Sequence, residues 1–95
     1  MASIDFENVA LVLVGKIVER LKLGQLHWGH LNIALYGVDD ELVTELSVDV
    51  SRDGTCKVLD AGVPTKLRGQ YPLIASVTDD VGTNLELTIT ARSEQ

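Results

Sequence analysis

The fold class follows from one stretch of the sequence, Leu42-Val43-Thr44-Glu45-Leu46-Ser47-Val48-Asp49-Val50. Side chains alternate between the two faces of a strand, so the mostly apolar even-numbered residues share one face and the mostly polar odd-numbered residues share the other. Asp53-Gly54 comes soon after, and residues 55–60 form a second extended stretch. An Asp-Gly pair supplies the positive φ that tight hairpin turns require. The sequence therefore predicts a β-hairpin with one buried face.

Turn signals recur at short intervals on both sides of this hairpin, as they do in a sandwich or a barrel. Between them, three further stretches alternate between apolar and polar residues: 31–36, 71–78 and 85–92. The last of these alternates most regularly, as expected for a sheet that has one face in water. The turn signals are Gly24-Gln25, Gly29, 37–40, Asp53-Gly54, 62–64, Gly69 and 79–84.

The first quarter of the chain allows two interpretations. Its apolar residues recur in pairs, which is a helical period. Asp5 is a candidate N-cap, Ile4 and Val9 are a candidate hydrophobic staple, and Gly24 is a candidate C-terminal stop. Against a helix, the segment is rich in β-branched residues, and Gly15 costs a helix about 1 kcal/mol relative to Ala. These local signals leave strand and helix open.

Four segments occur in an order that is typical of one family. They are Gly15-Lys16-Ile17-Val18-Glu19, then Gly24-Gln25-Leu26 with residues 29–37, then Asp53-Gly54-Thr55-Cys56-Lys57, and last Val63-Pro64 with residues 69–75. In this order they resemble the carboxypeptidase regulatory-like domains, which are prealbumin-like (transthyretin-like) β-sandwich modules. The likeness runs from Gly15 to Ile89. It departs from the family at His27-Trp28, at Cys56, which replaces an aromatic residue, and in the longer loop from Val63-Pro64 to Gly69.

The resemblance favours strands throughout, so the predicted fold is all-β. We expect a single antiparallel β-sandwich of about seven strands that forms one domain over residues 1–95. The alternative is an α+β fold, in which an N-terminal helix over residues 5–23 packs on a β-meander. The resemblance also implies a non-catalytic spacer, stabilising or interaction module. The Tyr-Arg-Gly-Ser ending of related hydrolases is absent, because this chain ends in Arg92-Ser93-Glu94-Gln95.

Charge argues against a nucleic-acid partner, and the length of the apolar runs argues against membrane insertion. The net charge of −6 and the scattered basic residues oppose nucleic-acid binding, which needs clustered Lys and Arg. The longest apolar run, residues 9–14, is too short to cross a membrane, and Asp5 and Glu7 before it are wrong for an export signal. We expect no membrane insertion and, for the chain as given, a cytoplasmic location unless a leader has been removed. Cys56, the single cysteine, excludes an internal disulfide and is expected to be a small buried hydrophobe.

Two groups of residues imitate metal sites. Asp49, Ser51, Asp53 and Asp60 take the places of calcium ligands around Gly54. The strand before this loop and the lack of a helix after it favour a hairpin turn instead. His27 and His30 are a candidate zinc pair, but a zinc site needs three or four ligands. No metal or other cofactor is therefore expected.

Aromatic and acidic residues complete the candidates. Trp28 and Tyr36 are candidate partner contacts, because both residue types are enriched at interface hot spots. Trp28 is alternatively a cap on the core, which we favour. The acidic residues at 39–41 and 79–80 are expected in solvated turns rather than in acid–base catalysis.

With no catalytic constellation in the sequence, we expect a non-catalytic binding or assembly module that acts through sheet edges and loops. Edge strands can add a strand from a protein partner or a second copy. Residues 85–91 or 9–14, which carry few charges, are the segments we expect a partner to cover. The alternatives are a small calcium- or zinc-binding module and an acidic inhibitor or immunity-type protein with a basic protein target.

Overall fold

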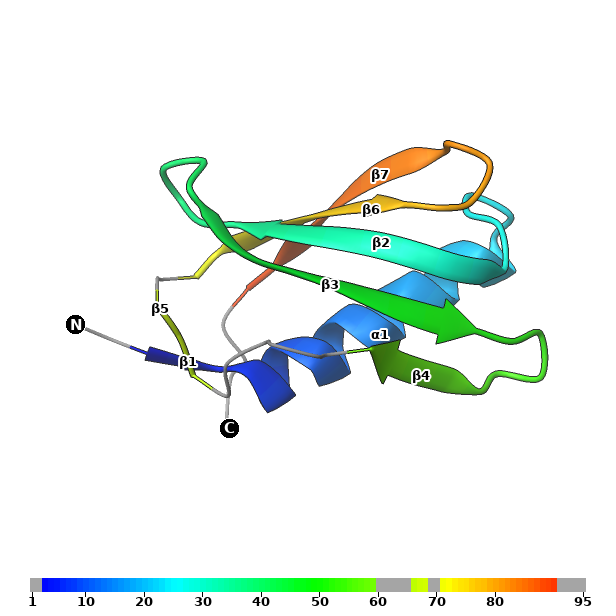
Figure 1. Ribbon diagram of the computed structural model, residues 1–95, viewed down its shortest axis with the longest axis horizontal. Coiled ribbons are helices and arrows are strands. Elements are labelled where there is room, and N and C mark those ends of the chain that lie inside the picture. Colours follow the sequence, from blue (N-terminus) through cyan, green and yellow to red (C-terminus); the bar gives the residue numbers. More distant parts are fainter. Residues whose placement is uncertain (1–2, 60–65, 69–70, 91–95) are drawn as a thin grey trace.

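The computed structural model describes residues 3–59, 66–68 and 71–90, which form one helix, a five-stranded sheet and a two-stranded ribbon (Figure 1). The five-stranded sheet has the order β4-β3-β2-β6-β7, and all its neighbours are antiparallel. The elements are β1 (Ser3–Asp5), α1 (Phe6–Lys22), β2 (Gly29–Tyr36), β3 (Leu42–Val50), β4 (Cys56–Leu59), β5 (Lys66–Arg68), β6 (Leu73–Thr78) and β7 (Asn84–Ile89).

The sandwich prediction is wrong in the first quarter of the chain, where α1 replaces the expected strands. The α+β alternative fits, and the helix begins and ends where its predicted caps lie. Asp5 is the N-cap, and its carboxylate accepts a hydrogen bond from the Glu7 N–H at 3.2 Å. Gly24 follows the helix at φ +76°, where its N–H donates to the Leu21 carbonyl at 3.1 Å. The Gln25 N–H donates to the Arg20 carbonyl at 2.9 Å, which completes a Schellman motif.

Burial along α1 has the period of a helix. Leu13 and Ile17 are fully buried, whereas Leu11 is 62% exposed. A strand would place residues 11, 13 and 17 on one face, so this difference between Leu11 and Leu13 requires the helical period. The caps and this buried stripe outweigh the helix cost of the β-branched residues and Gly15, because tertiary packing supplies most helix stability. The buried residues of the helix are Phe6, Val9, Leu13, Ile17 and Leu21.

The hairpin predicted from residues 42–60 is confirmed as β3 and β4 over the described residues. Val48 lies opposite Val58, and Val50 lies opposite Cys56. Gly54 takes φ +93° in the turn, and the Ser51 N–H donates to the Thr55 carbonyl at 2.8 Å. The strands predicted over 31–36, 71–78 and 85–92 are confirmed as β2, β6 and β7, within a few residues at their ends.

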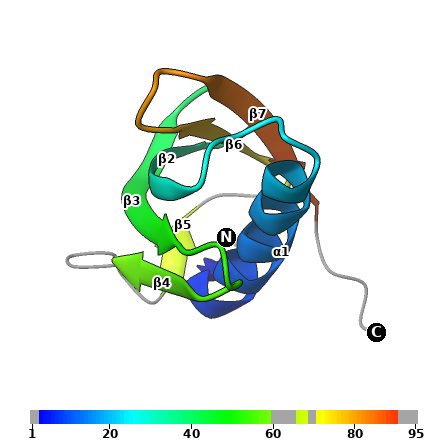
Figure 2. The same ribbon diagram turned by 90° about the vertical axis from the view of Figure 1, so that its right-hand side faces the viewer.

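The sheet curls around α1, which lies on its concave side (Figure 2). The apolar face of every strand points at the helix, and this layer holds the core.

Within the described residues, no helix combines the length and apolar character that a membrane crossing needs. Predictions that concern Asp60, Val63-Pro64, Gly69-Gln70 and residues 91–95 lie outside the described residues. The largest fully buried side chains of the core are Leu13, Ile17, Leu31, Leu35, Leu67, Leu73 and Ile89.

Candidate functional site

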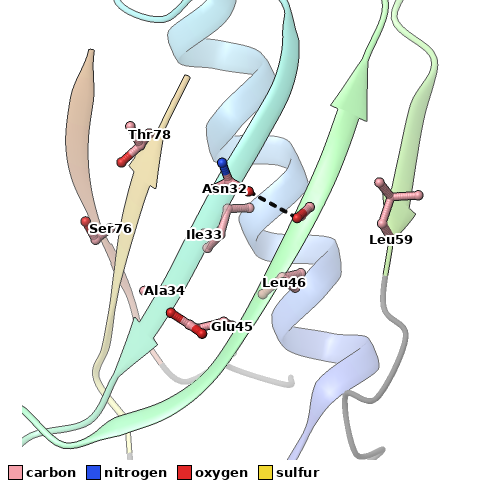
Figure 3. Close-up of a pocket in the computed structure, with 9 residues that line it drawn as sticks. Asn32, Ile33, Ala34, Glu45, Leu46, Leu59, Ser76 and Thr78 are labelled. Carbon is pink, nitrogen blue, oxygen red and sulfur yellow. Dashed lines mark hydrogen bonds between the residues drawn. The ribbon is translucent and has the colours of Figure 1, made fainter. Parts of the chain in front are cut away.

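The face of the sheet that points away from α1, here called the open face, carries a shallow groove of about 600 Å³ (Figure 3). The groove lies over the central strands β2 and β3 and reaches β6 and β4. Alternation along each strand sends apolar side chains to the helix and leaves small polar ones here. The residues that line the groove are Asn32, Ile33, Ala34, Glu45, Leu46, Ser47, Leu59, Ser76 and Thr78.

Strand register arranges these side chains in two rows across the sheet. One row runs Leu59, Ser47, Asn32, Thr78 and Asn84 from β4 to β7. The next row runs Glu45, Ala34, Ser76 and Glu86. Neighbouring strands lie about 4.8 Å apart, so the two glutamates are separated by roughly 14 Å. The small residues between them form a floor with a carboxylate on either side.

Most polar atoms of the groove already have partners, but Glu45 does not. The Ser47 hydroxyl donates to the Asn32 side-chain oxygen at 3.3 Å, as Figure 3 shows. The Asn84 side-chain amide donates to the hydroxyls of Ser76 at 2.9 Å and Thr78 at 2.8 Å. Glu45 is exposed and forms neither a hydrogen bond nor an ion pair within the described part of the chain. Its carboxylate extends from β3 beside Ala34 (Figure 3) and is free to bind a cation.

The outer edge of β7 is a second candidate surface. Among the described residues, β7 pairs only with β6 and ends the sheet. An edge strand exposes unpaired backbone donors and acceptors, which natural sheets usually protect with charges, Pro or bulges. Glu86 is the one charged residue from Asn84 to Ile89. This edge is therefore poorly protected against the addition of another strand.

The outer side of α1 is partly apolar, with Lys16, Glu19 and Lys22 among its residues. Leu11 and Leu23 are 62% and 63% exposed, and a groove of about 620 Å³ passes over Gly15 between them. The helix contacts β7, so α1 and the edge strand lie side by side (Figure 2). Of the two segments that we expected a partner to cover, residues 85–89 form the edge strand. Residues 9–14 lie in α1, and Leu11 is the one exposed residue among these six.

Asp79 was expected in a solvated turn and is instead buried, which corrects that prediction. Its carboxylate accepts hydrogen bonds from the N–H groups of His27, Val81 and Thr83, at 3.0, 3.1 and 2.8 Å. The His27 ring lies 2.9 Å from the same carboxylate. Burial alone would raise the pKa of Asp79. The hydrogen bonds from His27 and from the turn have the larger, opposite effect and lower the pKa to about 2. Asp79 thus fastens the β6–β7 turn to the segment that joins α1 to β2.

The predicted metal candidates do not come together in the described residues. His30 contacts Asp49 at 2.7 Å across β2 and β3, whereas His27 contacts Asp79. The hydrogen bond with Asp49 raises the pKa of His30. Asp53 accepts a bond from the Thr55 N–H at 2.8 Å, which lowers its own pKa. Ser51 is exposed in the same hairpin turn, Asp60 is not described, and no group of three or more His, Cys, Asp or Glu in the described part of the chain is arranged to hold a metal ion.

The aromatic candidates and the cysteine lie at the border of the core. Trp28 is half-buried and packs against the core, as the capping interpretation expects. Tyr36 is half-buried at the end of β2, where register puts it beside Ile74. Cys56 packs against the core from β4, and burial raises the pKa of its thiol. A raised pKa keeps this thiol protonated and poorly nucleophilic.

Comparisons of the chain with protein-family models, with curated proteins and with solved structures found no significant match. The resemblance to carboxypeptidase regulatory-like domains therefore stays a prediction. The groove on the open face and the burial of Asp79 were not predicted from the sequence. A local signal for Asp79 existed, because an Asp before a Gly-containing turn often accepts backbone hydrogen bonds.

Proposed function

We propose that this protein is a non-catalytic binding and assembly module that pairs through the edge of β7. The observation that carries the proposal is a six-residue edge strand with a single charge at the margin of a well-packed sheet. Main-chain hydrogen bonds give affinity in strand addition, and the side chains beside them set specificity. The simplest partner is a second copy of the chain.

Pairing of two β7 strands is favourable in a register that suits its side chains. Residues that lie directly opposite each other share a face, so an antiparallel pair centred on Leu87 places Glu86 opposite Thr88 of the second copy. A pair centred on Glu86 would instead place two carboxylates opposite each other, which is unfavourable. The first register also continues the apolar face of the sheet, because Leu85 lies opposite Ile89 of the second copy.

A six-residue edge is too small to hold a stable dimer by itself, because specific interfaces bury about 1,200–2,000 Å² in total. The partly apolar outer side of α1 supplies further area, since Leu11 and Leu23 are exposed on the helix that contacts β7. In this arrangement a second copy adds its own strand to the β7 edge and packs its own helix beside α1.

Variants at Thr88 test this proposal, because Thr88 is exposed and lies opposite Glu86 in the favoured register. Size-exclusion chromatography with light scattering measures the mass of each variant over a range of concentrations. Thr88→Lys places an ammonium group against Glu86 and strengthens association, whereas Thr88→Glu weakens it. Each cross-strand pair contributes about 0.2–1 kcal/mol, and a two-fold dimer contains two. A monomeric wild type at high concentration contradicts the proposal, and so does equal association of the two variants.

The charge distribution favours the acidic inhibitor or immunity-type protein as a second candidate function. The five-stranded sheet and its described turns are strongly acidic, whereas α1 carries Lys16, Arg20 and Lys22 beside Glu7 and Glu19. A basic protein would be attracted to the sheet side of the molecule. The acidic residues on that side are Asp39, Asp40, Glu41, Glu45, Asp49, Asp53, Asp79, Asp80 and Glu86, against Arg52 and Lys57.

A further inference from the structure

We infer that the groove on the open face binds an arginine side chain from an extended, basic segment of a protein partner. This site is separate from the β7 edge. It rests on the second candidate function, in which the partner is basic, and it holds whether or not β7 also accepts a strand.

The charge of the open face selects a cationic occupant. Glu45 borders the groove without a partner of its own in the described residues, and Glu86 stands at the other end of the same row. Asp49 lies on the same face and is engaged by His30. Lys57, which lies opposite Asp49, is the only Lys or Arg that the described strands of the sheet place on this face. A carboxylate that is already exposed loses little hydration when a cation binds, so its attraction is not offset by a large desolvation cost.

The shape of the groove suits a long side chain that carries its charge at the tip. Ala34 and Ser76 form a low floor between Glu45 and Glu86, along which an aliphatic stem can lie. Leu59, 36% exposed on β4, borders the groove on the other side of β3 and in the adjacent row. Arginine buries its methylene groups along such surfaces while its guanidinium finds acceptors.

The acceptors favour guanidinium over ammonium. A guanidinium presents five N–H donors in a planar fork, which a carboxylate accepts in pairs. Glu45 provides two oxygens, and the oxygens of Asn32 and Ser47 lie in the adjacent row. An arginine tip over Ala34 therefore has more than one acceptor within the groove.

Other occupants fit less well. A metal ion needs several ligands, and Glu45 is the one carboxylate among the lining residues. An apolar ligand would meet a floor whose side chains are mainly small and polar. A basic segment in an extended conformation matches both the flat sheet and the charge.

Nuclear magnetic resonance titration of ¹⁵N-labelled protein tests the inference. The probe is acetyl-Gly-Arg-Gly-amide, and the control probe has citrulline, which is neutral and nearly isosteric, in place of arginine. We expect saturable shifts of the amides of Asn32, Ala34, Ser47 and Ser76 with the arginine probe and much smaller shifts with citrulline. Glu45→Gln should weaken binding about two- to fivefold, the effect of losing one exposed charge pair.

Two further variants make the result decisive. Glu41→Gln removes a carboxylate from the exposed β2–β3 turn, outside the groove, and should bind the probe like the wild type. Ala34→Leu fills the floor beside Glu45 while leaving the carboxylate in place and should abolish binding, while far-UV circular dichroism confirms the fold. Equal binding of citrulline, unchanged affinity in Glu45→Gln, or shifts spread over all the acidic turns would overturn the inference. None of these outcomes depends on the oligomeric state, so this inference and the β7 proposal fail separately.

Discussion

Two leucines that lie two residues apart distinguish the helix from the strand that the family resemblance favours. Leu13 is 1% exposed and Leu11 is 62% exposed. Replacing a buried Leu by Ala costs about 2–5 kcal/mol through lost transfer energy and the cavity left behind. For Leu13, which is fully buried against the sheet, we take about 3 kcal/mol. A domain of this size is stable by about 5–14 kcal/mol in total, so Leu13→Ala removes a large fraction.

Leu11→Ala is the matched control, because the chemical change is identical. Exposed substitutions stay within about 0.5 kcal/mol, and Ala is the better helix former. Thermal unfolding followed by circular dichroism at 222 nm, at low protein concentration, measures both variants. We expect Leu13→Ala to lower the thermal midpoint by about 12–24 °C and Leu11→Ala to leave it nearly unchanged. In a strand the two residues share a face, so equal costs for the two variants would refute the helix.

Three further predictions concern two glycines and the titrating groups Asp79 and His30. Gly15→Ala stabilises the protein by about 0.5–1 kcal/mol, because Gly15 lies in the helix with no atom within 4 Å of an added Cβ. Gly24→Ala destabilises it, because Gly24 has a φ of +76°. Urea titrations measure the two opposite changes in the free energy of unfolding. The pKa of Asp79 is lowered from 3.8 to about 2, so its stabilising effect is complete above pH 3.8 and is lost as the pH falls towards 2; Asp79→Asn flattens the acid side of the melting profile. The pKa of His30 is raised above 6.5 by its hydrogen bond to Asp49. The contribution of this pair to stability is therefore complete below pH 6.5 and is lost as the pH rises through the folded-state pKa. Asp49→Asn should lower the pKa of His30, as measured by a titration of its ring protons.

The sheet was predictable because its signals are local. Alternation along residues 42–50 and the Asp53-Gly54 turn specify β3, β4 and which face is buried, and the structure agrees. The N-terminal segment was not decided locally, because β-branched residues favour a strand while the caps favour a helix. Most segments of the family resemblance lie in strands and turns that both folds share, so the resemblance had little power to distinguish them.

The open-face groove could not be predicted because it depends on pairing between distant segments. Ala34 meets Ser76 only when β2 pairs with β6, and no local pattern specifies that partner. The same holds for His27 and Asp79, which are 52 residues apart in sequence. The polarity of the groove residues was visible in the alternation, but their arrangement in rows was not.

One helix is sufficient to cover this sheet because the sheet is curled. The alternating strands leave one apolar face that must be buried, and a second sheet or a helix can bury it. Helix α1, with 17 residues, is about 25 Å long, close to the length of the eight-residue strand β2 at about 3.3 Å per residue. Antiparallel strands twist, so β4 and β7 approach the two sides of α1 (Figure 2) and the core closes without a second sheet. The opposite face then needs no second layer, and its small polar residues and Glu45 stay accessible among the described residues.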